Sequence, residues 1–92
     1  MKDVITIDFT GVASYWEVHS ILINSLELPS YYGRNLDALY DCLSEVGCED
    51  EPVKVKLTGM DAADEKMGKY MIAIKRVFDD ASHNNPWLKI EN

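Results

Sequence analysis

Three short β-prone runs, separated by longer stretches of helical periodicity, most constrain the fold of this 92-residue chain. Apolar residues dominate positions 4–9, alternate with lysines in positions 53–58, and return in positions 87–90. Alternation at every second position is typical of a strand. Residues 53–58 therefore either have one wetter face or lie near a sheet edge. The first run, ended by Thr10 and Gly11, is predicted to be largely buried.

The first helix is predicted to begin at a capping box formed by Ser14 and Glu17. In this motif the side chain of each residue accepts a hydrogen bond from the backbone amide of the other. Pro29 prevents the helix from continuing. The residues expected to form its buried stripe are Tyr15, Val18, Leu22 and Leu26. His19 lies next to this stripe, and we expect it to be a structural histidine rather than a ligand or a base.

Helical structure is predicted again after Gly59, which ends the second strand. It starts at residues 61–64, and Gly68 is expected to join a short helix to a longer one. Apolar residues keep helical spacing through 67–81, and residues 83–86 are a stop signal. The order of elements predicts an α/β fold, with a small three-stranded parallel sheet and helices packed against it.

The length and charge of the chain limit what it can bind. Ninety-two residues, 47% of them hydrophobic, predict a single domain over residues 1–92 with one modest core. Nine Lys and Arg against sixteen Asp and Glu give a net charge of −7, which disfavours nucleic acid or an anionic membrane as a direct partner and favours a basic protein. No apolar run is long enough to span a membrane, and Asp3 and Asp8 interrupt the first one. We therefore expect a cytoplasmic protein.

The two cysteines, Cys42 and Cys48, are too few for a disulfide framework, and we expect both to be thiols. Together with His19 and His83 they match no usual zinc spacing. No metal site and no cofactor are predicted.

A helix with one acidic face is predicted directly after the loop at residues 28–35. Its apolar stripe is expected to comprise Leu36, Leu39, Tyr40, Leu43 and Val46. Asn35 is placed to cap it, and Gly33 is expected to free the backbone just upstream. Asp37 and Asp41 project together roughly opposite the apolar stripe, with Glu45 one turn further along. Three carboxylates are thus predicted to stack along one side.

Two interpretations of these carboxylates compete. Asp37 alone is explained by its favourable position near the amino end of the helix dipole. Asp41 is not, because the dipole effect fades after the first turn and like charges four residues apart cost about 0.2–0.5 kcal/mol. A row of carboxylates beside Tyr31 and Tyr32 would gain most from a cationic surface. The residues therefore favour an acidic recognition face.

The same stretch carries a resemblance to a known family. Residues 28–44 read Leu-Pro-Ser-Tyr-Tyr-Gly-Arg-Asn-Leu-Asp-Ala-Leu-Tyr-Asp-Cys-Leu-Ser, which closely resembles the signature of the barstar family of intracellular ribonuclease inhibitors. His19 and residues 77–81 support the resemblance outside this stretch. It implies a barstar-like fold and an inhibitor that lays this helix and loop across a ribonuclease active site, its carboxylates in the place of substrate phosphates. The implied partner is a basic extracellular ribonuclease or RNase toxin in a 1:1 complex, and the free protein is expected to be a monomer.

The resemblance also assigns residues. Asp41 is similar to the family's central carboxylate, Asp37 to the second, and Asp80 to the acidic residue on the last helix. The other implied partner-binding residues are Tyr31, Gly33, Asn35, Leu36, Tyr40 and Ser44.

Three positions depart from the best-known member of the family. Arg34 stands where that protein has an acidic residue, and Tyr40 and Val46 stand where it has Trp. An arginine at the rim would repel part of a basic surface, so the partner is expected to present an acid there or to be a different toxin. Asp80 replaces a longer Glu, so Asp79 is an alternative contact.

Two other functions would also use an acidic helix. An enzyme could use Asp37 and Asp41 as an acid and base pair, but a solvent-facing helix offers no cleft to shift a pKa, and no nucleophile elbow, phosphate loop or metal set accompanies them. We therefore do not expect an enzyme. The alternative to inhibition is a barstar-like interaction module that binds a basic partner other than a ribonuclease.

Overall fold

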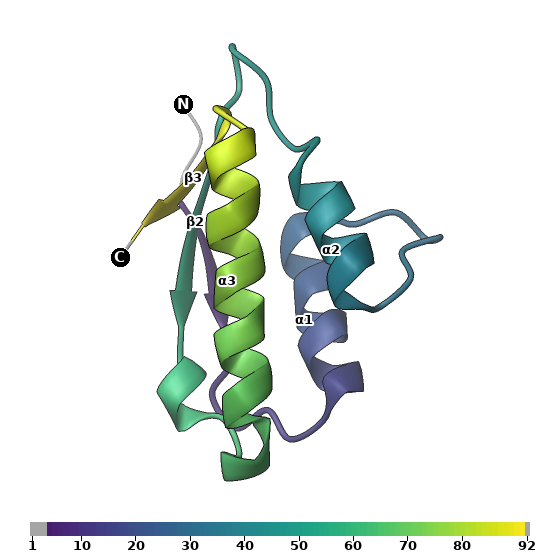
Figure 1. Cartoon of the computed structure of the whole chain (residues 1–92), viewed down its shortest axis with the longest axis vertical. Helices are drawn as coiled ribbons and strands as arrows, with labels where there is room; N and C mark the ends of the chain where they lie inside the picture. The colour runs from purple at the N-terminus through teal and green to yellow at the C-terminus, as the bar shows by residue number, and fades with distance from the viewer. Residues whose placement is uncertain (1–3, 92) are drawn as a thin grey trace.

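The computed structural model describes residues 4–91 and confirms the predicted α/β fold. The strands of its one sheet are β1 (Ile5–Asp8), β2 (Val53–Thr58) and β3 (Leu88–Glu91). The helices are α1 (Tyr15–Leu26), α2 (Leu36–Leu43) and α3 (Gly68–Asn84), with two 3₁₀ turns, η1 (Met60–Ala62) and η2 (Glu65–Met67), before α3. The helices lie together on one side of the sheet (Figure 1).

The sheet is parallel, with strand order β1-β2-β3. One crossover joins β1 to β2, and the next joins β2 to β3, so both lead to the neighbouring strand in the same direction across the sheet. Because both crossovers have the same hand, their helices lie on the same face. On that face Ile7, Val55 and Leu88 are buried, whereas Lys54 and Lys56 on the opposite face are exposed. β2 is the central strand, so its alternating pattern reflects one wetter face and not an edge position.

The core lies between this inner face and the helices. Its largest fully buried side chains include Phe9, Phe78, Ile7, Leu22, Leu39, Leu43, Ile74 and Leu88. Because α2 contributes Leu39 and Leu43, the acidic helix is packed on the core by one side only. Its other side is left to solvent.

The predicted cap of α1 forms with one difference. The Glu17 amide donates to Ser14 Oγ at 3.2 Å, as expected. The Glu17 carboxylate accepts from the Ala13 amide at 2.9 Å instead of the Ser14 amide. The capping box therefore includes one more residue on the amino-terminal side, Ala13.

The buried stripe of α1 is confirmed for Val18 and Leu22 but wrong for Tyr15. Tyr15 is 62% exposed. It is the first residue of the helix, where the side chain projects past the core, and its ring packs on that of Tyr70 with 4.4 Å between centroids. The aromatic surface at this end of the molecule is thus larger than the sequence predicts.

Gly59 turns the chain at the end of β2, as predicted. Its φ is 69°, a left-handed conformation, and a Cβ there would collide with Asp8 and Thr10. Only glycine satisfies both conditions. Gly68 begins α3 directly after η2, which confirms it as the junction between a short and a long helical segment.

No helix within residues 4–91 is long and apolar enough to cross a membrane. Both cysteines are free thiols, as predicted. Cys42 is half-buried and Cys48 is exposed. Burial, followed by the nearby carboxylates of Asp41 and Glu45, raises the pKa of the Cys42 thiol.

Candidate protein-binding site

The loop before α2 presents one tyrosine and buries the next. The Tyr32 amide donates to the Pro29 carbonyl at 3.0 Å and closes a tight turn. Tyr31 at its tip is 86% exposed, whereas Tyr32 is in the core. The sequence placed both tyrosines beside the carboxylates, and the structure leaves only Tyr31 available for a partner.

Tyr32 is held by His19, which is a buried structural residue as predicted. His19 Nδ1 lies 2.7 Å from the Tyr32 hydroxyl, and its Nε2 is hydrogen-bonded to the Tyr70 hydroxyl. These contacts join α1, the loop and α3. Burial, and then the charge of Arg34, lowers the pKa of His19. A neutral imidazole donates from one ring nitrogen and accepts at the other, which suits two hydroxyl partners.

The start of α2 is fixed by its cap. Asn35 Oδ1 accepts from the Ala38 amide at 2.8 Å, and Asn35 Nδ2 donates to the Gly33 carbonyl at 3.0 Å. Gly33 was expected to supply backbone freedom before the helix. That reason is wrong, because the residue in the left-handed conformation is Arg34, with φ 51°. Glycine suits position 33 because a Cβ would lie 3.1 Å from the Asn35 side-chain amide.

Arg34 is folded back onto α1. Its guanidinium carbon lies 3.5 Å from the centroid of the Trp16 ring. Its Nη1 donates to the Trp16 carbonyl at 3.2 Å and to Ser20 Oγ at 3.1 Å. The cation is therefore fixed at the edge of the acidic face, and it does not extend over that face.

The acidic face of α2 lies opposite its buried residues. Asp37 and Asp41 are exposed, and among the described residues neither carboxylate has a hydrogen-bond or ion-pair partner. The prediction of a third helical carboxylate was wrong. α2 ends at Leu43, so Glu45 lies in the following turn, where its amide donates to the Cys42 carbonyl. Exposed carboxylates without internal partners remain available to an external cation.

The end of α2 is held by Asn85, whose role sequence reasoning missed. Asn85 is 2% exposed. Its Nδ2 donates to the carbonyls of Leu43 at 2.8 Å and Val46 at 2.9 Å, and its Oδ1 accepts from the Trp87 amide at 2.9 Å. The local pattern at residues 83–86 indicated a helix stop, and nothing in it pointed to a partner some forty residues away.

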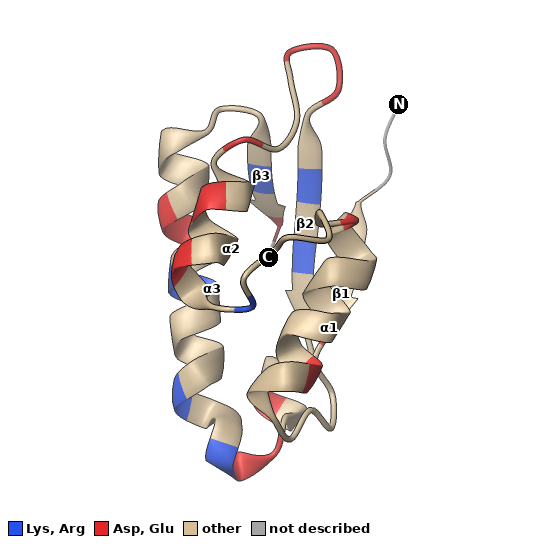
Figure 2. Ribbon diagram, turned by 90° about the vertical axis from the view of Figure 1, so that its right-hand side faces the viewer, with Lys and Arg blue, Asp and Glu red and all other residues tan. Residues whose placement is uncertain are grey.

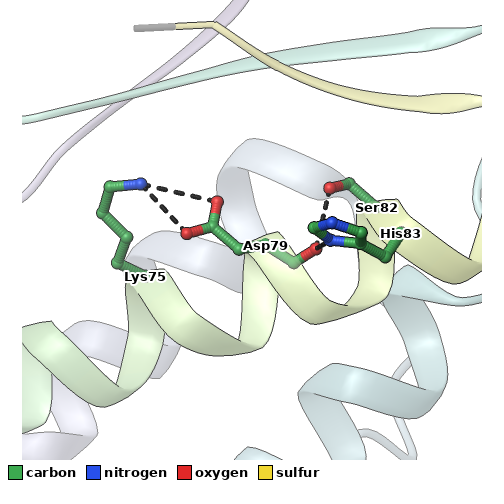
Figure 3. Close-up of polar contacts among 4 residues, drawn as sticks. All are labelled: Lys75, Asp79, Ser82 and His83. Carbon is green, nitrogen blue, oxygen red and sulfur yellow. Dashed lines mark hydrogen bonds and ion pairs between the residues drawn. The ribbon is translucent and has the colours of Figure 1, made fainter.

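Two adjacent acids on α3, Asp79 and Asp80, have different surroundings, and Figure 3 shows the contacts of Asp79. The Asp79 carboxylate pairs with Lys75 Nζ at 3.1 Å, and the Asp79 carbonyl accepts from Ser82 Oγ and His83 Nδ1, each at 2.9 Å. Asp80 is exposed, and its carboxylate has no partner within residues 4–91. Of the two, Asp80 is the acid available for binding.

Tyr40 and Asn84 connect Asp80 to the acidic helix. Asn84 Nδ2 donates to the Tyr40 hydroxyl at 2.7 Å and contacts the Asp80 carbonyl at 3.3 Å. Residues four apart share one helix face, so Asp80 lies on the side of α3 that borders α2. Figure 2 shows acidic positions gathered on α2 and the adjoining part of α3, with lysines along β2 and β3.

The residues predicted from the sequence to bind a partner lie on α2, the adjoining loop and turn, and one turn of α3. They are Tyr31, Gly33, Asn35, Leu36, Asp37, Tyr40, Asp41, Ser44 and Asp80. Leu36, Tyr40 and Ser44 are half-buried, and the other six are exposed. Ser44 Oγ donates to the Tyr40 carbonyl at 2.8 Å, so its hydroxyl is already engaged. Their role in binding stays a prediction.

The fold and the site define a class: a small α/β protein that presents an acidic helix on the helical side of a three-stranded parallel sheet. A family model described as "Barstar (barnase inhibitor)" matches residues 2–89. A Bacillus subtilis (strain 168) protein named "Putative ribonuclease inhibitor YrdF" is 38% identical over 64 residues, which cover 70% of this chain and 68% of that protein. The chain belongs to the barstar family.

Proposed function

We propose that this protein inhibits a basic extracellular ribonuclease or RNase toxin in a 1:1 complex. In this proposal α2 and the loop before it lie across the enzyme's active site. Membership of the barstar family supports a role of the ribonuclease-inhibitor kind, as does the name of the Bacillus subtilis relative. The observation that carries the mechanism is the position of Asp37, Asp41 and Asp80 on adjoining elements. All three are exposed, and none of their carboxylates has a hydrogen-bond or ion-pair partner within residues 4–91.

The chemistry of a ribonuclease explains why carboxylates suit this task. Such an enzyme must present Arg, Lys or His to the scissile phosphate. Carboxylates accept charge-assisted and often bidentate hydrogen bonds from the same groups. The net charge of −7 also accelerates the encounter with a basic protein. An inhibitor of this kind uses cations that the enzyme needs for its own reaction.

The rigidity of the site supports the proposal. Asn35 holds the start of α2 and Asn85 holds its end. Tyr32 holds the loop through His19. A surface fixed before binding loses little conformational entropy when the complex forms.

The direct test is a ribonuclease assay on a fluorogenic RNA substrate. A panel of small basic secreted ribonucleases is titrated with the wild-type protein and with Asp41→Ala. Stoichiometric inhibition of one enzyme is expected, weakened about ten- to a hundredfold by the substitution, because a charged hydrogen-bond partner is lost from a buried contact.

A matched control comes from the neighbouring acids of α3. Asp80→Asn and Asp79→Asn make the same change in charge one residue apart. We expect Asp80→Asn to weaken inhibition and Asp79→Asn to leave it unchanged. If no enzyme is inhibited, the result favours a barstar-like module for a basic partner that is not a ribonuclease. If Asp41→Ala inhibits as well as wild type, the assigned face is wrong.

A further inference from the structure

Arg34 is the only Lys or Arg between Lys2 and Lys54, and it stands directly before the acidic helix. A cation at this place weakens the general attraction of the acidic face for a basic partner. The structure holds Arg34 in a left-handed backbone conformation, stacked on Trp16 and bonded to Ser20. A charge that is held this firmly has a defined position relative to Asp37.

The guanidinium is only partly used by the fold. Both internal hydrogen bonds come from Nη1. The N–H groups on Nε and Nη2 donate to no residue in the part of the chain that the structure describes. Arg34 is half-buried, and Trp16 beneath it is 66% exposed. A planar guanidinium with unused donors on a fixed aromatic ring is prepared to take a carboxylate in bidentate geometry.

An open hollow beside Arg34 gives a partner side chain room to approach. Its volume is about 390 Å³. The residues that line it are Tyr15, Arg34, Asn35, Leu36, Asp37 and Tyr70. Tyrosine, tryptophan and arginine are the residue types enriched at the energetic centres of protein interfaces. The hollow meets the acidic face at Asp37, so one partner can cover both.

We propose that Arg34, supported by Trp16, is a specificity site that binds an Asp or Glu side chain on the rim of the partner's active site. This inference rests on the proposed function and identifies which basic ribonucleases the protein accepts. The acidic face attracts every basic ribonuclease, whereas Arg34 accepts those with a carboxylate at the matching rim position and repels those with a lysine or arginine there. Discrimination by a repulsive contact is a general means of choosing among similar partners.

The test uses the ribonuclease of the panel that the wild-type protein inhibits most tightly. Inhibition constants are measured for wild type, Arg34→Glu and the control Lys54→Glu. Both substitutions make the same change in net charge, but Lys54 is exposed on the outer face of the sheet. General attraction to a basic enzyme would make both variants bind slightly more tightly. We expect Arg34→Glu to weaken inhibition about ten- to a hundredfold and Lys54→Glu not to weaken it.

The enzyme side gives a second measurement that leaves the fold of the inhibitor untouched. Each Asp and Glu at the mouth of the ribonuclease active site is changed in turn to Lys. One of these enzyme variants is expected to resist the wild-type inhibitor. The Arg34→Glu inhibitor should bind that variant at least about tenfold more tightly than the wild-type inhibitor does, which is the signature of a direct pair. Thermal unfolding of Arg34→Glu shows whether the loop is still folded.

The outcomes separate this inference from the proposed function. If Arg34→Glu inhibits as well as wild type and no enzyme variant shows coupling, the specificity site is refuted. The proposed function still stands in that case, provided Asp41→Ala weakens inhibition. If wild type inhibits no ribonuclease, both are refuted.

Discussion

Replacing Asn85 with alanine tests how the acidic helix is held. The Asn85 side chain makes three hydrogen bonds: two donated to the carbonyls of Leu43 and Val46, and one accepted from the Trp87 amide. Alanine makes none of them. Because the site is buried, the three backbone groups would lose their partners where water has little access.

The magnitude follows from these contacts. A typical internal hydrogen bond contributes about 1 kcal/mol, and a buried group left without a partner costs about 1–3 kcal/mol. Loss of three such bonds should therefore lower the free energy of unfolding by about 3 kcal/mol. For a domain of this size each 1 kcal/mol shifts Tm by about 4–8 °C, so a fall of about 12–24 °C is expected.

Urea unfolding followed by circular dichroism measures this change, and Asn84→Ala is the matched control. Asn84 is exposed at the end of α3, and its side-chain bond to the Tyr40 hydroxyl is open to water. We expect that control to lose less than about 1 kcal/mol. If Asn85→Ala also lost less than about 1 kcal/mol, water would be replacing the amide, and the assigned role of Asn85 would be wrong.

Three further predictions concern other parts of the fold. The pKa of His19 is lowered from 6.5 in the folded protein, so the unfolded chain takes up the proton first as the pH falls. The contribution of His19 to the free energy of unfolding should therefore be complete above pH 6.5 and be lost below it. Urea unfolding between pH 7.5 and about pH 5 should show a smaller change in that free energy with pH for His19→Gln than for wild type. Gly59→Ala should lower Tm more than Gly11→Ala does. Both glycines have positive φ, but of the two only position 59 lacks space for a Cβ. Equal decreases in Tm would contradict the predicted collision. Iodoacetamide should modify Cys48 before Cys42, read by mass spectrometry, because Cys42 is half-buried with a raised pKa.

Local patterns in the sequence predict much of this fold. The alternation in residues 53–58 and the caps at Ser14 and Asn35 depend on neighbours a few residues away, and the structure confirms them. Tyr15 shows where such reasoning fails. Its spacing fits the buried stripe, but a residue at the first turn projects past the end of the core, and only the packing of α3 shows this.

The contacts that hold the candidate site are less predictable because they join residues far apart in the chain. Asn85 reaches Leu43, and Arg34 reaches Trp16, through relations that exist only once the helices have packed. The motif at residues 28–44 identified the acidic face, since its residues are consecutive. It contained no signal for Asn85 and none for the position of the Arg34 side chain.

The central claim is that the carboxylates of α2 occupy the phosphate site of a ribonuclease, and competition tests it most directly. Binding of this protein to the inhibited enzyme is measured with increasing amounts of a nucleoside 3′-monophosphate that fills the active site, at constant ionic strength. Our account predicts that the two ligands exclude each other. The measured Kd then equals the intrinsic Kd divided by the fraction of enzyme with an empty active site, so it rises linearly with nucleotide concentration. A Kd that stays constant when the site is saturated would contradict it.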